Sequence, residues 1–349
     1  MMQNNQAIPF NKENFKQIFS VPFVVVIIIS IPSAIIADFF NIPLAWFLGP
    51  MLVTSLASLM GLKIKMPRLV LSSILILLGL YIGNYIDKSL FAQMHQWIWT
   101  SLIMLVYIIV SVLIVSKYLE KFSNYEKKTS IFSAAPGALG PLMILAEDEK
   151  TDLSQVATSH LIRLIIIITV FPFIVNSFYD VKGIKIAQEV IENQNFQHLL
   201  ILIISSIILI YFFDKLKVPA ALLSGTLVAS GFLQITEIAI YQISPDIIDY
   251  CLLILGASVG CRFADKTFSE IGRNALHSFV ATFLLVVLGV IAALVAGLII
   301  DKNFFTLLLS YCPGGIYEVA VIAIFFDLDP EFVSFHHIIR LLMILFIVP

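Results

Sequence analysis

The chain alternates long apolar runs with short polar connections. Stretches such as "VPFVVVIIISIPSAII" and "LLVVLGVIAALVAGLII" approach the roughly 20 apolar residues that cross a bilayer. The pattern predicts apolar segments near 21–40, 43–61, 69–86, 97–117, 129–147 and 156–178, and in the second half near 198–213, 219–237, 246–263, 276–300, 303–326 and 332–349. The expected fold is an all-α polytopic membrane protein.

The composition supports this fold class. Of the 349 residues, 60% are hydrophobic and 13% are charged, whereas a soluble domain carries about 25% charged residues. The net charge of −2 predicts no nucleic-acid partner and no broad basic surface. Cys251, Cys261 and Cys312 lie in or beside apolar segments without a CxxC pair, so we expect small buried hydrophobic residues and not disulfide or metal ligands.

The two halves of the chain repeat one motif. At an offset of 177 positions they share a Pro-Gly pair, an acid and a His-x-x-Arg pair. These residues are Pro136, Gly137, Asp152, His160 and Arg163, and Pro313, Gly314, Asp329, His337 and Arg340. The expected organisation is a cytoplasmic tail (1–20), a first membrane repeat (21–178), a connecting loop (179–197) and a second membrane repeat (198–349).

A second repeated feature is a pair of glycines four residues apart. Gly79-x-x-x-Gly83 in the first half recurs as Gly256-x-x-x-Gly260 in the second. Small residues at this spacing let helices approach closely in lipid. We therefore expect a close helix crossing at each pair.

The basic residues indicate how the repeats face the membrane. Proline removes a backbone donor and glycine permits a sharp turn, so the Pro-Gly segments 129–147 and 303–326 are expected to be broken, although a kinked continuous helix is the alternative. If both segments enter and return on one side, 15 Lys and Arg lie inside, 4 outside and 2 within spans. This asymmetry satisfies the positive-inside rule.

The predicted topology is about ten transmembrane helices plus two re-entrant or broken Pro-Gly segments, in two repeats of inverted topology. Its amino terminus is cytoplasmic, in a bacterial-type cytoplasmic (inner) membrane. Inverted repeats with interrupted helices are typical of secondary transporters.

The two motifs resemble the AbrB-type duplicated membrane protein family, also catalogued as an ammonia monooxygenase. Its members carry a Pro-Gly-Gly segment, an acidic turn, His-x-x-Arg and a closing proline. "PGGIYE" is the closer copy, because "PGALGP" has Ala138 for the second glycine and Pro141 where the second copy has Glu318. The family is labelled as transporter, as regulator of gene expression and as oxygenase, so the resemblance implies a fold more firmly than an activity.

The candidate site combines both copies of the motif. An arginine within a span costs about 2.5–3.5 kcal/mol, so it usually faces a cavity or a partner. Broken helices also direct backbone N–H groups inward, which suits an anion such as a carboxylate. The predicted substrate-binding residues are Pro136, Gly137, His160, Arg163, Pro313, Gly314, Gly315, His337 and Arg340.

Structural roles remain open for these side chains. The arginines could instead snorkel to the interface or pair with Asp152 or Asp329. The predicted coupling residues are Glu318, Asp152 and Asp329. Glu318 could carry a proton, because burial favours the neutral acid, or it could neutralise one of the arginines.

Three function classes can be compared with these residues, namely an enzyme, a secondary transporter and a regulatory membrane protein. The six histidines include no His-x-His or HExxH pattern, so no metal site, cofactor or enzyme is expected. The expected function is secondary transport of a small anionic solute coupled to a proton or sodium. The alternative is a transporter-like membrane protein that regulates gene expression indirectly, without catalysis. The expected partners are the lipid bilayer and a small-molecule or ion substrate, and a homodimer is compatible with both functions.

The inverted topology predicts which loops can be labelled from each side. Cysteines introduced at 180–195 should react with an impermeant reagent from outside, and cysteines at 264–274 from the cytoplasm. Labelling of both regions from the same face would contradict the inversion.

Overall fold

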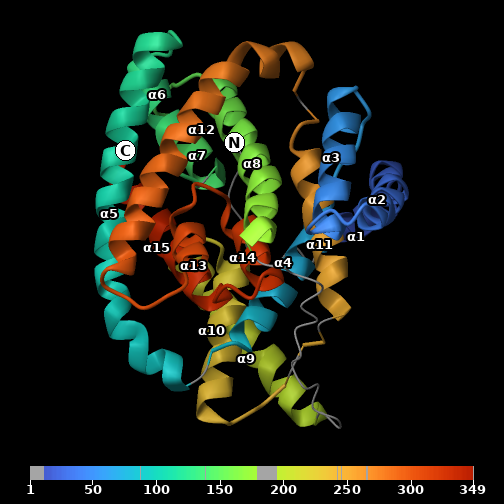
Figure 1. Ribbon diagram of the computed structural model, residues 1–349. Coiled ribbons are helices and arrows are strands. Elements are labelled where there is room, and N and C mark those ends of the chain that lie inside the picture. Colours follow the sequence, from blue (N-terminus) through green and yellow to red (C-terminus); the bar gives the residue numbers. More distant parts are fainter. Residues whose placement is uncertain are drawn as a thin grey trace. The chain divides into compact units, whose positions relative to one another are not determined.

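The computed structural model describes residues 12–86, 88–137, 139–178, 195–241, 243–244, 246–264 and 266–348. Every regular element in these ranges is a helix (Figure 1). The first-half helices are α1 (Lys12–Ile18), α2 (Val21–Phe39), α3 (Ala45–Leu59), α4 (Arg68–Gly83), α5 (Lys88–Phe122), α6 (Lys127–Ala134), α7 (Leu139–Asp148) and α8 (Leu153–Phe178). The second-half helices are α9 (Phe196–Lys215), α10 (Ala221–Thr236), α11 (Asp246–Cys261), α12 (Phe268–Gly297), α13 (Phe304–Tyr311), α14 (Ile316–Phe325) and α15 (Pro330–Ile347). The predicted all-α fold is confirmed.

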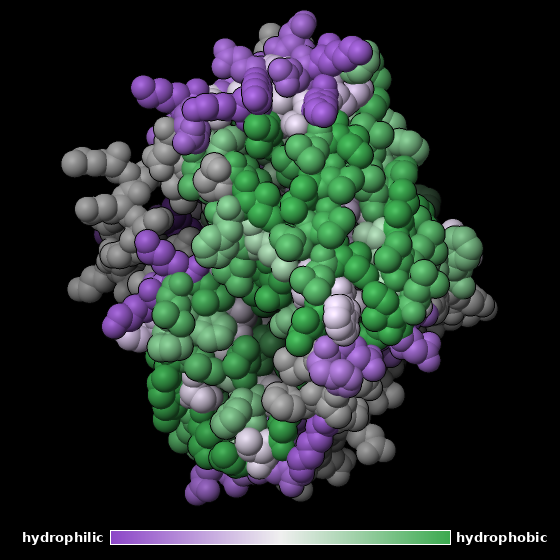
Figure 2. Space-filling view, turned by 90° about the vertical axis from the view of Figure 1, so that its left-hand side faces the viewer, coloured by the Kyte–Doolittle hydropathy of each residue, from purple (hydrophilic) through white to green (hydrophobic). Residues whose placement is uncertain are grey.

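The helix lengths fit a multi-pass membrane protein. Within the described ranges, 6 helices are long and apolar enough to cross a membrane, namely α2, α8, α9, α15 and most of α5 and α12. The apolar helices α3, α4, α10 and α11 are shorter, at 15 to 16 residues. Hydrophobic side chains such as Ile28 of α2, Val106 of α5 and Leu294 of α12 are exposed. Broad hydrophobic areas on the visible face (Figure 2) agree with contact to lipid.

The helices group into two compact units, each with elements from both repeats. Unit one contains α1–α4 and α9–α11, and unit two contains α5–α8 and α12–α15. The units therefore cut across the predicted membrane repeats 21–178 and 198–349, whose boundaries remain a prediction. The predicted loop 179–197 lies mostly outside the described residues.

Unit one is built on two close helix crossings, α4 against α10 and α3 against α11. A β-carbon on Gly79 would lie 2.5 Å from the carbonyl oxygen of Leu223. A β-carbon on Gly256 would overlap the carbonyl oxygen of Phe47. The Gly-x-x-x-Gly pairs thus lie at backbone contacts, as their spacing predicts.

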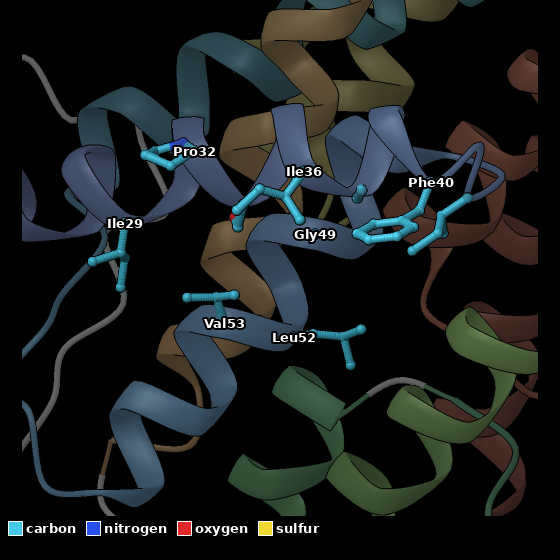
Figure 3. A pocket seen from close by; sticks show the side chains of 10 residues that line it. Ile29, Pro32, Ile36, Phe40, Gly49, Leu52 and Val53 are labelled. Carbon is cyan, nitrogen blue, oxygen red and sulfur yellow. The ribbon is translucent and has the colours of Figure 1, made fainter.

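An apolar pocket lies between α2 and α3 in the same unit (Figure 3). It is lined by Ile29, Pro32 and Ile36 of α2 and by Gly49, Leu52 and Val53 of α3. None of the candidate site residues lines it.

Unit two contains both Pro-Gly segments, and each is a helical hairpin. Hairpin one consists of α6 and α7, and hairpin two consists of α13 and α14. At the open end of hairpin one, Lys128 Nζ lies 2.5 Å from a carboxylate oxygen of Glu149. At the open end of hairpin two, Lys302 Nζ lies 2.9 Å from a carboxylate oxygen of Asp329. Because residues before and after each break meet, the alternative of a kinked, continuous helix is wrong.

The hairpins open at opposite ends of α8. This helix starts directly after hairpin one, and its last residue, Phe178, packs against Phe305 at the start of hairpin two, with ring centroids 5.4 Å apart. Half-helices of 8 and 10 residues reach about 12–15 Å, roughly half of a bilayer core. This is the geometry expected of inverted repeats, while the orientation in a membrane stays a prediction.

The crossing of α3 and α11 can be tested at Gly256. Gly256→Ala should destabilise the protein by about 1–3 kcal/mol, because the added methyl group meets fixed backbone. The matched control is Gly272→Ala in α12, where nothing lies within 4 Å of the added carbon. Thermal unfolding in detergent should show a lower Tm for Gly256→Ala only, and equal Tm values would contradict the close crossing.

Candidate functional site

The two breaks share a backbone pattern. The residues that end α6 and α13, Ala135 and Cys312, are extended, with ψ of 127° and 132°. Proline follows each of them, so neither half-helix continues. Gly137 then turns with φ of +98°, a conformation that favours glycine.

The arginines bind the backbone carbonyls that these breaks expose. Arg163 donates from Nη1 to the carbonyl of Ala135 at 2.5 Å, and from Nη2 to that of Ser133. Arg340 donates from Nη1 to Cys312, and from Nη2 to Gly314 at 2.6 Å. The last carbonyls of a helix lack intrahelical partners, and a cation at this end is stabilised by the helix dipole. Each arginine therefore caps a half-helix of its own repeat.

The histidines bind the same half-helices one turn earlier. His160 Nε2 lies 3.0 Å from the carbonyl oxygen of Phe132, and His337 Nε2 lies 2.9 Å from that of Leu309. A carbonyl only accepts, so each Nε2 carries the proton. Nδ1 of His337 then accepts from Arg340 at 3.1 Å, which makes His337 the neutral tautomer.

The tip of each hairpin is the Pro-Gly turn between its two half-helices. The two tips lie together, because Gly137 of hairpin one lies beside Arg340, which binds the turn of hairpin two. A β-carbon on Gly137 would lie 2.6 Å from Nη2 of Arg340 and 3.1 Å from the carbonyl oxygen of Gly314. A β-carbon on Gly314 would lie 3.6 Å from Ile167 of α8. Both breaks, which are far apart in sequence, thus lie at one centre inside unit two.

Both guanidinium groups are buried at this centre without an acidic partner. Arg163 is 2% exposed and Arg340 is 0% exposed, so neither snorkels to a surface. Within the described residues, no carboxylate lies within ion-pair distance of either, and both Nε atoms lack a hydrogen-bond partner. The alternative ion pairs with Asp152 and Asp329 are therefore not formed.

The aspartates lie at the open ends of the hairpins. Asp152 accepts at 3.0 Å from the amide of Gln155 at the start of α8, and its own amide donates to Thr129. Asp329 accepts from Lys302 and, at 3.2 Å, from Thr306. Eleven residues of helix separate each aspartate from the arginine of its motif, about 16 Å. The structure thus does not bring these two predicted coupling residues to the tips.

Glu318 does lie at the tips, in the first turn of α14. Its carboxylate covers Gly315, where a β-carbon would overlap it. A carboxylate there stabilises the positive end of the helix. Pro141 holds the equivalent position of α7, so this feature is confined to the second hairpin.

Two tyrosines near the tips were not predicted from the sequence. Tyr107 and Tyr311 are buried, their rings lie 6.1 Å apart, and Tyr107 interacts electrostatically with both arginines. Tyr311 donates to the carbonyl of Thr100 at 2.8 Å. Neither tyrosine is repeated at the 177-residue offset, so a comparison of the two halves of the sequence could not identify them.

A cluster of three or more His, Cys, Asp or Glu that could hold a metal ion is absent from the described residues. The chemistry of the tips is instead that of a buried cationic centre lined by backbone amides and aromatic rings.

These features define an all-helical, multi-pass membrane protein with two Pro-Gly hairpins capped by His-x-x-Arg. The chain belongs to the AbrB family, whose model, described as "Transition state regulatory protein AbrB", matches residues 2–83 and 46–349. The resemblance seen in the repeated motif is thereby confirmed.

Two relatives span most of the chain. "Uncharacterized protein YhjN" of Bacillus subtilis (strain 168) is 22% identical over 290 residues, which cover 78% of this chain and 75% of the relative. "Putative regulator AbrB" of Escherichia coli (strain K12) is 22% identical over 309 residues, which cover 87% and 88%. A comparison with solved structures finds no significant match.

The contact between the tips can be tested at Gly137. Gly137→Ala should cost more stability than a positive φ alone, about 1–2 kcal/mol, because the methyl group also displaces Arg340. Gly61→Ala is the matched control, since Gly61 has φ of +87° and nothing within 4 Å. Thermal unfolding of both variants measures the difference, and equal losses of Tm would mean that the tips are apart.

Proposed function

We propose that this protein is a secondary transporter of a small anion, which binds at the meeting tips of the two hairpins. The observation that carries the proposal is the pair of buried arginines, neither of which has a carboxylate partner among the residues that the structure describes. A buried, uncompensated charge is costly in a membrane, so such residues usually mark a substrate or ion pathway.

The helix dipoles offset part of this positive charge. A helix carboxyl end carries about half a negative charge, so the ends of α6 and α13 together offset about one of the two guanidinium charges. These four groups together leave about one positive charge at the tips. The sum does not include Glu318 or the amino ends of α7 and α14. A monovalent anion such as a carboxylate would balance it.

Glu318 makes coupling to a proton plausible on electrostatic grounds. An ionised Glu318 offsets part of the positive charge at the tips, whereas a protonated Glu318 leaves more of it for the anion. Binding of a proton and of the anion would then favour each other, which is the thermodynamic basis of coupling. Sodium is the alternative coupling ion.

The second candidate function is regulation without transport. It is supported by the names of the family and of the Escherichia coli relative, which both describe regulators. A solute-sensing membrane protein would bind the anion without moving it. Vesicles with reconstituted protein, screened with labelled organic acids and amino acids, separate the two. Saturable, gradient-dependent flux supports transport, and binding without flux supports sensing.

The role of the arginines can be tested by Arg163→Lys and Arg340→Lys. Lysine keeps the charge but loses the planar fork, so each variant should weaken anion binding by about 1–3 kcal/mol. Each should also lower Tm, because the fork caps two carbonyls. Affinity and Tm should be measured on the same purified variants.

Arg68→Lys is the control, because Arg68 is exposed at the start of α4. It should change neither quantity. Stable Arg163→Lys and Arg340→Lys proteins with unchanged affinity would remove both arginines from the site.

The coupling role of Glu318 has a separate test. Glu318→Gln should retain anion binding and flatten the pH dependence of flux, since glutamine keeps the shape but cannot ionise. An unchanged pH profile would exclude Glu318 as the residue that carries the proton.

A further inference from the structure

A buried acid lies at the open end of hairpin two. Glu331 is the second residue of α15 and is only 6% exposed. Its Oε2 atom has no hydrogen-bond partner among the described residues. A carboxylate held this way loses most of its hydration, and no hydrogen bond offsets this loss at Oε2, which favours the neutral acid.

The charged groups around Glu331 also favour the neutral acid on balance. Asp329 and Asp327 lie two and four residues before Glu331, and Lys302 is the cation bound at this end of the hairpin. Lys302 is already paired with Asp329 at 2.9 Å, and Thr306 donates to the other oxygen of Asp329 at 3.2 Å. The single nearby cation is therefore shared with a carboxylate that holds it directly.

We propose that Glu331 is a proton-binding site at the open end of hairpin two, separate from Glu318 at the tips. A proton from water bonds to a carboxylate oxygen, the side chain becomes neutral, and release to water reverses the step. A role of this second proton in transport rests on the proposed function, whereas the binding of the proton does not.

The position of Glu331 suits the entry of a proton. Its counterpart in the first repeat is Ser154, which cannot ionise in this way, so the site belongs to hairpin two alone. On the predicted topology, the open end of hairpin two faces outside. Glu318 is the third residue of α14, so seven further residues of this helix, about 10 Å, lie between it and the end near Glu331. The proposed proton site at the open end of hairpin two and the proposed anion site at the tips thus lie at opposite ends of α14.

Infrared spectroscopy tests the proton directly. Wild-type protein in detergent should show the C=O stretch of a protonated carboxylic acid near neutral pH, where exposed carboxyls are ionised. Glu331→Gln should lose this band, whereas Glu318→Gln, which removes the buried carboxyl at the tips, should retain it. The control Glu147→Gln should retain it, because Glu147 is exposed. A band that is absent from the wild type, or that persists unchanged in Glu331→Gln, would overturn the proposal.

The pH dependence of stability gives a second readout. The folded protein binds this proton more tightly than the unfolded chain, so the stabilising protonation is lost as pH rises. The wild-type Tm should fall between about pH 5 and pH 8 relative to that of Glu331→Gln. Parallel curves for the two proteins would contradict the proposal.

Two neighbouring substitutions should move the midpoint of the infrared titration in opposite directions. Asp329→Asn removes a negative neighbour and frees Lys302, so the midpoint should fall by about one pH unit. Lys302→Gln removes the positive neighbour, so the midpoint should rise by a similar amount. Unchanged midpoints in both variants would exclude this cluster as the site.

Failure of the proposed function gives a different result. If the protein moves no solute, the infrared band, the Tm curves and both midpoint shifts persist without flux. If Glu331 binds no proton, flux can persist while these signatures are absent.

Discussion

The constraint on which unit two depends is the hydrogen bonding of backbone carbonyls at membrane depth. Breaking a helix there leaves carbonyls that neither water nor the next turn can satisfy. The His-x-x-Arg pair of each repeat supplies the missing donors 26 to 30 residues along the chain. The Pro-Gly break and the His-x-x-Arg pair are therefore one structural unit, in which the pair supplies the hydrogen-bond donors that the break requires.

The same combination of break and His-x-x-Arg pair concentrates positive charge where the hairpins meet. A neutral donor such as asparagine could satisfy one carbonyl, but a guanidinium group reaches two and brings a full charge. Because the two hairpins open at opposite ends of α8, their tips lie together, and the guanidinium groups of Arg163 and Arg340 both lie beside the tips. Helix dipoles offset only part of their charge, so the capping of the breaks and the proposed affinity for an anion have the same physical origin.

The sequence predicted the helical hairpins well because duplication marks them twice. The predicted segments 129–147 and 303–326 became α6–α7 and α13–α14, with breaks at the expected prolines. The segment predicted to begin near 276 begins earlier, at Phe268 of α12. Its first turns are polar and follow a capping box formed by Thr267 and Glu270, and a hydropathy pattern does not detect such a start. The roles of Asp152 and Asp329 at the open ends, together with Thr129 and Thr306, depend on which chain ends meet. A linear pattern does not contain that information.

The departures from symmetry carry the remaining functional argument. Both copies keep the arginine that caps the break. Only the second copy has an acid in the first turn after the break, Glu318, and a buried acid at the open end of its hairpin, Glu331. The first copy has proline and serine at these positions. Capping is required wherever a helix breaks, so both copies must retain it, whereas the proposed proton coupling needs an ionisable group on one hairpin only. The shared residues thus explain how the fold is held, and the unshared acids make hairpin two the candidate for a change of charge.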